Sequence, residues 1–143
     1  MNPLILGGVA GIGAGAVLLF LSHIAPRFGA GNFVRDADRM RLFGRAYSHR
    51  EAHLLGMMVH LILSFFFGIV FSFGVQSGII DGYRLIPLAG YSLVLTIFMG
   101  GVILPLEGHG LFGTREDAWF PVDMLLTNIG WAVLYGLVMM VWG

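Results

Sequence analysis

Apolar residues run in four long stretches along the chain, separated by shorter polar segments. These stretches cover about residues 3–24, 54–75, 85–105 and 121–142, and almost no charged residue falls within them. At about 1.5 Å of rise per residue, a helix of about 20 residues crosses a hydrocarbon core of about 30 Å. A transmembrane barrel would instead show alternating segments of about 10 residues, a pattern that this chain lacks. The pattern therefore predicts an all-α integral membrane four-helix bundle that forms one transmembrane domain, residues 1–143.

Composition agrees with this prediction and narrows the chemistry. The chain is 57% hydrophobic and 11% charged, with a mean hydropathy of +0.86, far from the values of soluble domains. It has no cysteine, which excludes disulfides and thiolate metal sites held by this chain. The formal net charge is zero, so nothing indicates a nucleic-acid partner. No basic segment precedes the first stretch, so we expect a retained anchor and not a cleaved signal peptide.

The arginines are distributed unevenly between the two sides of the predicted bundle. Seven of the eight basic residues lie in the loop at about residues 25–53 or in the link at 106–120, and only Arg84 lies on the opposite side. Cytoplasmic loops of membrane proteins collect basic residues. We therefore expect both termini outside the cytoplasm, and the prokaryotic cytoplasmic (inner) membrane as the location.

The loop before the second span has two interpretations. Phe33, Ala37, Met40 and Tyr47 fall near one face of a helix, which favours an amphipathic helix lying in the membrane interface. Gly44 weakens the pattern, and a solvated basic linker is the alternative. In the first case, four arginines would bind anionic lipid headgroups at the cytoplasmic face: Arg35, Arg39, Arg41 and Arg45.

Small residues recur at every fourth position within the spans, which places them on one face of each helix. Their missing bulk allows neighbouring backbones to approach closely, so we expect packing stripes. Asn128 in the fourth span should seek a hydrogen bond to another helix. The predicted packing residues are Gly7, Gly11, Gly15, Ser64, Gly68, Ser72, Ser92, Thr96, Gly100, Asn128, Ala132 and Gly136.

Histidines supply the candidate chemistry. His60 lies within the second span, four residues before Ser64, so it should point into the bundle. An ionisable residue inside a span is a functional candidate, here for cofactor binding. The alternative is a neutral imidazole that hydrogen-bonds to a neighbouring helix.

A divalent metal or haem is the cofactor that these histidines could hold. His49 and His53 are four residues apart, and on a helix both rings would lie on one side. His60, Glu107 or His109 could complete a zinc or iron site. A haem held by two histidines would need both rings at one depth, which His60 and His23 do not share unless a partner chain supplies a ligand.

The stretch PLEGHGLFG joins the third span to the link that follows it. Pro105 should end or kink the span, and the glycines should let the chain reverse tightly at the membrane surface. Glu107 and His109 then either face water or turn inward toward His53 and His60. The sequence leaves these alternatives open.

These pieces resemble a group of small four-span prokaryotic membrane proteins, the YagU-like proteins. The shared features are a glycine-rich first span, His60 followed by Gly68, the Pro-Leu-x-Gly-x-Gly-x-Phe pattern of residues 105–112, and a Leu-Tyr-Gly near the end. The resemblance implies the four-span fold and an inner-membrane location, and it brings no established activity. Asn128 stands where some relatives would carry histidine, so a shared two-histidine site is not implied.

Three functions remain. Walker, GxSxG and GxGxxG motifs are absent, so our leading hypothesis is a non-enzymatic protein that acts through helix association, as a homo-oligomer or an accessory subunit of a membrane complex. The first alternative is a histidine-rich metal- or haem-binding redox protein at the cytoplasmic face. The second is proton or small-solute permeation past His60 by an oligomer.

Overall fold

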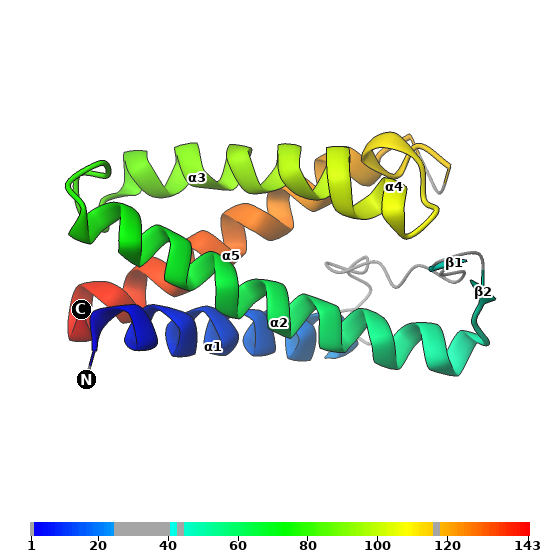
Figure 1. The fold of residues 1–143 in the computed structure, drawn as a ribbon, viewed down its shortest axis with the longest axis horizontal. Coiled ribbons are helices and arrows are strands. Elements are labelled where there is room, and N and C mark those ends of the chain that lie inside the picture. The colour runs from blue at the N-terminus through cyan, green and yellow to red at the C-terminus, as the bar shows by residue number, and fades with distance from the viewer. Residues whose placement is uncertain (1, 25–40, 43–44, 116–117) are drawn as a thin grey trace.

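Helices dominate the part of the chain that the structure describes, and four helical segments there are long and apolar enough to cross a membrane (Figure 1). The computed structural model describes residues 2–24, 41–42, 45–115 and 118–143. The four segments are α1 (Pro3–Ile24), α2 (His49–Gln76), the continuous stretch Leu85–Leu106, and α5 (Phe120–Trp142). The all-α class is confirmed for the described residues, and the four apolar segments are compatible with a multi-pass membrane protein.

The second span begins earlier than its hydropathy predicts. The apolar stretch starts at about residue 54, but α2 begins at His49 because a capping box precedes it. The Glu51 carboxylate accepts from the Ser48 backbone N–H at 3.0 Å, and the Glu51 backbone N–H donates to the Ser48 hydroxyl at 3.4 Å. These bonds satisfy backbone groups that the first turn of a helix otherwise leaves open. Hydropathy marks the apolar run, whereas the cap marks the start of the helix.

The third span changes its helical form before it ends. It consists of α3 (Leu85–Phe98), a π-helical turn η2 (Met99–Ile103) and the short α4 (Leu104–Leu106). Pro105 has no N–H and its ring crowds the preceding turn. The helix widens just before it, where the Leu104 N–H bonds to the carbonyl of Met99, five residues back. The helical stretch therefore continues past Pro105 and ends one residue later than expected.

The loop between the first two spans is described only in part. β1 (Arg41–Leu42) and β2 (Arg45–Ala46) pair as a short antiparallel ladder, with Arg41 opposite Ala46. An amphipathic helix through these four residues is therefore wrong, because their backbone bonds run between two strands. The rest of that prediction, over residues 33–40, lies outside the described residues.

Each long helix packs against one or two of the others. α1 lies along α2, α5 crosses behind them, and α3 packs against α5 (Figure 1). Both termini and the turn between α2 and α3 lie together at one end, which we call the termini end. The β1–β2 ladder, α4 and the 3₁₀ turn η3 (Leu111–Gly113) lie at the other, the loop end.

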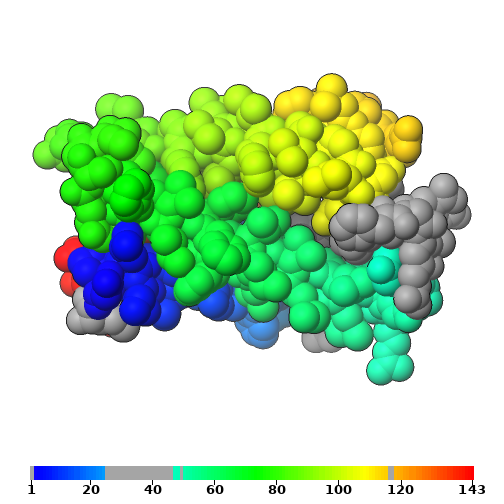
Figure 2. Space-filling model, viewed as in Figure 1, coloured from blue at the N-terminus to red at the C-terminus, as the bar shows by residue number. Residues whose placement is uncertain are grey.

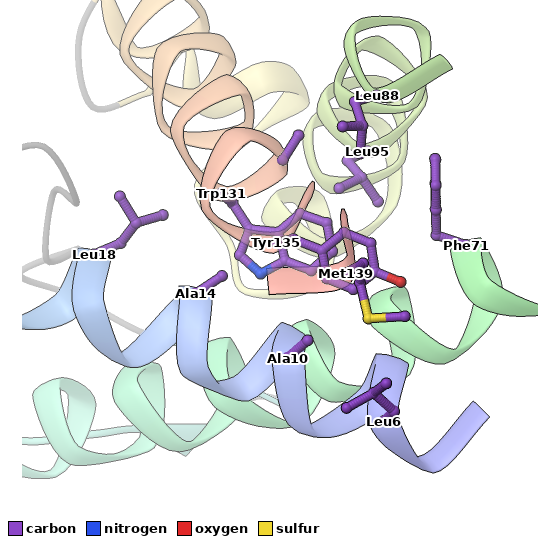
Figure 3. Close-up of a cluster of buried hydrophobic side chains, with 11 residues drawn as sticks. Leu6, Ala10, Ala14, Leu18, Phe71, Leu88, Leu95, Trp131, Tyr135 and Met139 are labelled. Carbon is purple, nitrogen blue, oxygen red and sulfur yellow. The ribbon is translucent and has the colours of Figure 1, made fainter. Parts of the chain in front are cut away.

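The core lies where α5 passes between the other helices (Figure 3). Trp131 and Tyr135 of α5 are almost fully buried, and their rings stack 4.9 Å apart. Small side chains of α1, including Ala10 and Ala14, make room for these rings. Phe71 of α2 contacts the Tyr135 ring edge-on, at 5.7 Å between ring centroids. The aromatic side chains thus join α1, α2 and α5 in one cluster.

Candidate functional site

Small residues form the interface between α1 and α2. A Cβ atom on Gly11 would meet the carbonyl oxygen of Ser64, and one on Gly68 would meet the carbonyl oxygen of Gly7. Any larger side chain would force the two backbones apart and lose their dispersion contacts. Gly15 faces the Ser64 hydroxyl in the same way. Six of the predicted packing residues therefore lie in one interface within the chain: Gly7, Gly11, Gly15, Ser64, Gly68 and Ser72.

Buried hydroxyls extend this interface into a hydrogen-bond network. The Tyr135 hydroxyl donates to the carbonyl oxygen of Gly68 at 3.0 Å, and it lies 2.9 Å from Ser72 Oγ. The Tyr83 hydroxyl lies 3.2 Å from the same Ser72 oxygen. Each hydroxyl has one proton, so the bonds run in one direction, from Tyr83 through Ser72 and Tyr135 to the Gly68 carbonyl. The network thereby joins α2, α5 and the turn before α3.

Trp131 bonds to α1 in the same manner. Its indole Nε1 donates to the carbonyl oxygen of Gly11 at 3.1 Å, which is accessible because glycine carries no side chain. Trp131 and Tyr135 were not among the predicted site residues, because aromatic residues in an apolar span suggest packing only. Their spacing of four residues, on one face of the fourth span, was the available signal.

Polar side chains also join α3 to α5. Asn128 Nδ2 donates to Thr96 Oγ1 at 2.9 Å, which gives the amide its partner on another helix. The Ser92 hydroxyl donates within its own helix to the Leu88 carbonyl oxygen at 2.9 Å. Near the termini end, Gly136 leaves space for the Leu88 side chain. The polar residues of this interface are therefore satisfied locally and do not point into an open site.

The PLEGHGLFG stretch closes the third span with a Schellman motif. The His109 N–H bonds to the Leu104 carbonyl at 2.9 Å, and the Gly108 N–H bonds to the Pro105 carbonyl at 3.1 Å. Gly108 has φ +88°, the left-handed conformation that this motif requires and that glycine adopts readily. The motif turns the chain back on the helix and places His109 against it. His109 is fully buried, so it does not face water, which was the first of the two alternatives.

Glu107 lies beside His109 at the loop end. Its carboxylate Oε2 is 3.8 Å from His109 Nε2, and its side chain is 13% exposed. Burial raises the pKa of the Glu107 carboxyl, because a charged carboxylate loses its hydration, and the nearby His109 opposes this shift. The two side chains form a buried ionisable pair at the end of the third span.

Phe112 packs this link against the π-helical turn. Its backbone has φ +53°, a strained conformation for a bulky residue, with a cost of about 1–2 kcal/mol. The ring lies against Gly100, where a Cβ atom would come within 2.6 Å of ring atom Cε1. Gly100, predicted as a packing residue, thus receives a side chain from the link and not from a neighbouring span.

His60 faces α1 at the interface between the first two spans. Its Nε2 atom is buried and makes no hydrogen bond with any residue that the structure describes. The same atom lies 3.4 Å from the position of a Cβ on Gly15. Substitution of Gly15 would therefore displace the Ser64 side chain and place the new Cβ atom in contact with the histidine.

A second pair of histidines meets at the loop end of the α1–α2 interface. The rings of His23 and His53 lie 5.4 Å apart between centroids, at an interplanar angle of 68°. His23 Nδ1 lies 2.8 Å from the Leu19 carbonyl oxygen. The sequence gives no signal that pairs these residues, because the long loop between them hides how close the end of α1 lies to the start of α2.

The predicted metal ligands do not converge among the residues that the structure describes. No group of three or more histidine, aspartate or glutamate side chains in this part of the chain could hold a metal ion. Glu107 and His109 lie together, as described above. His49 is the first residue of α2, and its side chain lies outside the described residues.

The predicted headgroup ligands fall mostly outside the described residues. Arg35 and Arg39 lie in the segment that is not described. Arg41 and Arg45 belong to the β1–β2 ladder, where the backbone alone is described. Binding of anionic lipids by these residues remains a prediction.

Comparison with known proteins does not identify a family. No protein-family model, no curated protein and no solved structure matches this chain. The resemblance to the YagU-like proteins therefore stays a prediction.

Proposed function

We propose that this is a non-enzymatic, multi-pass protein of the prokaryotic cytoplasmic membrane that acts through helix association. It would work as a homo-oligomer or as an accessory subunit of a membrane complex. The observation that supports this proposal is the exposure of the outer side of α2, which no other helix of the described structure covers. Only 17% of the apolar 18-residue stretch of α2 is buried within the chain, against 39% for α1.

The outer face of α2 carries a continuous row of large side chains. They recur at intervals of four residues, and then three, along the helix, so consecutive members are neighbours and together form a ridge that winds gradually around α2. All are about half exposed, and α2 lies on the side of the molecule toward the viewer in Figure 2. We call them the α2 row: Leu54, Met58, Ile62, Phe66, Val70 and Phe73.

The glycine stripes do not supply this association surface. Gly7, Gly11 and Gly15 are already covered by α2 of the same chain. In membranes, helices associate through packing, because lipid is as apolar as the side chains. The α2 row therefore has two candidate neighbours, lipid or another protein, and we propose the second.

Cysteine crosslinking in native membranes tests this proposal. The chain has no cysteine, so a single substitution reports without background. Ile62→Cys should be captured by a bifunctional maleimide, while Leu137→Cys, equally apolar and exposed on α5, should not. A band at twice the chain mass indicates a homo-oligomer, and a heavier mixed band indicates a subunit of a complex. The proposal fails if neither Ile62→Cys nor Phe66→Cys forms a crosslink and the solubilised protein is monomeric.

We also propose a topology in which both termini lie outside the cytoplasm. The arginine distribution supports it, since seven of eight lie in the two segments on the opposite side. The two termini lie at the same end of the molecule, as an even number of spans requires. The arginines of the first loop would then meet the anionic lipids of the inner leaflet.

Permeation past His60 is a second candidate, because its buried Nε2 lacks a partner among the described residues. The aromatic cluster around Trp131 and Tyr135 fills the core between the helices, so a path would have to run between chains of an oligomer. In proteoliposomes, this function predicts a pH-dependent flux that His60→Ala abolishes. Equal flux in wild type and variant would contradict it.

A further inference from the structure

Two histidines from distant parts of the sequence meet where the α1–α2 pair ends. His23 lies in the last turn of α1 and His53 in the second turn of α2. Their ring centroids are 5.4 Å apart. Neither residue belongs to the α2 row, so their contact is independent of the association that we propose above.

The ring separation matches that of two imidazoles on one tetrahedral metal ion. A zinc–nitrogen bond of about 2.0–2.1 Å places each ring centroid about 3.2 Å from the metal. At a tetrahedral angle, two such centroids lie about 5.2 Å apart, close to the value observed. Two histidines on opposite sides of a haem iron would lie about 6.3 Å apart, with the porphyrin between them. The contact therefore favours a small cation over haem.

The hydrogen bond of His23 involves Nδ1 and leaves Nε2 available to bind a metal. The Leu19 carbonyl oxygen can only accept, so Nδ1, at 2.8 Å from it, carries the proton. In the neutral ring, Nε2 then carries a lone pair. Histidine ligands of metals commonly have this arrangement, in which the second ring nitrogen donates to a carbonyl and fixes the ring.

One more histidine lies close by along the backbone of α2. α2 places His49 one turn before His53. Glu51 is held in the capping box with Ser48, so it does not provide the next ligand. Two or three histidines with water in the remaining position suit a late first-row transition metal.

We propose that His23 and His53 form a site for a divalent transition metal such as zinc at the loop end of α1 and α2. The metal would tie the end of α1 to the start of α2 and so fix the two helix ends that flank the arginine-rich loop. This site differs from the set expected from the sequence, which joined His49 and His53 to His60, Glu107 or His109 and left His23 out.

Zinc titration of the purified protein tests this site. Metal-free protein in lipid nanodiscs is titrated with zinc chloride against a chromophoric chelator. We expect one zinc per chain at micromolar concentrations, and an affinity at least about tenfold weaker in His23→Gln and in His53→Gln. His60→Gln, two turns further along α2, is the matched control and should bind as wild type. Copper(II) should bind more tightly than zinc.

A ligand swap separates loss of the site from loss of the fold. Because the chain has no cysteine, the double variant with His23→Cys and His53→Cys brings in two thiolates, which are zinc ligands, and under reducing conditions it should regain binding. With cobalt(II), this variant should show the absorption of a tetrahedral thiolate complex. The proposal is overturned if wild type binds no zinc at micromolar concentrations, or if His23→Gln binds as wild type.

Discussion

Gly11 and Gly13 are two residues apart in α1 but face different surroundings. A Cβ atom at Gly11 would overlap the Ser64 carbonyl oxygen of α2, whereas one at Gly13 would meet nothing within 4 Å. We therefore expect Gly11→Ala to lower the free energy of unfolding by about 1–3 kcal/mol, as overpacking does in well-packed cores. Gly13→Ala should instead be neutral or stabilise by about 0.5–1 kcal/mol, since alanine favours helix. Unfolding in detergent measures both.

Equal effects at the two positions would contradict the difference in surroundings between Gly11 and Gly13. If both variants were destabilised, the outer face of α1 would also be covered, as by a second copy. If neither were, the two backbones would lie further apart than in this structure.

Glu107 predicts a stability that depends on pH. Burial raises the pKa of its carboxyl above the ordinary value of 4.5, so the folded protein binds this proton more tightly than the unfolded chain. The resulting stabilisation is complete below pH 4.5 and is lost as the pH rises through the raised pKa. Above that, wild type bears the cost of a buried carboxylate, at about 1.4 kcal/mol per unit of pKa shift.

Glu107→Gln, which stays neutral, should therefore be more stable than wild type at neutral pH. The difference should shrink to nothing as the pH falls toward 4.5, and melting temperatures across this range measure it. Asp81→Asn is the control, because that carboxylate and its partner Arg84 are both exposed. A Gln variant that is less stable than wild type at neutral pH would mean that Glu107 and His109 act as a stabilising charged pair.

At the scale of the element, sequence patterns located the spans better than their ends. The first and fourth spans begin and end within about one residue of the apolar runs, because lipid requires apolar side chains along the whole helix. The start of α2 was missed because its first turn is polar, and Ser48-x-x-Glu51 was the signal for it. The π-helical turn was also missed, since residues 99–103 are uniformly apolar and give no periodicity.

The end of the third span depends on one glycine. Gly108 has φ +88°, which costs an L-residue about 1–2 kcal/mol. Gly108→Ala should thus destabilise the protein by about that amount and loosen the turn that buries His109. The expected sign of loosening is increased modification of His109 by diethyl pyrocarbonate, mapped by mass spectrometry. Gly101→Ala, at an exposed position where a Cβ meets nothing within 4 Å, should leave both stability and modification unchanged.

At the scale of the whole molecule, the sequence predicted the number and character of the spans but not which side chains meet. Hydropathy depends only on neighbouring residues in the sequence, so it predicts the spans without knowledge of the tertiary structure. The contact of His23 with His53 depends on how two helix ends lie after an intervening loop. The bond of Trp131 to the Gly11 carbonyl depends likewise on how α5 crosses α1. No local pattern carries that information.

The uneven distribution of arginines predicts the orientation of the molecule in the membrane. Asn2 and Ser77 are exposed at the termini end, and Thr114 is exposed at the loop end, so each can carry a single cysteine in a chain that has none. In right-side-out vesicles, a membrane-impermeant maleimide should label Asn2→Cys and Ser77→Cys at once. Thr114→Cys should be labelled only after the membrane is permeabilised.

The seven-to-one distribution of arginines is the physical reason for this expectation, because segments rich in basic residues stay on the cytoplasmic side. The reverse pattern of labelling would place the arginine-rich loop outside and remove the basis for its contact with anionic lipids. Labelling of all three positions in intact vesicles would mean that both orientations occur. In that case two copies could pair in opposite directions.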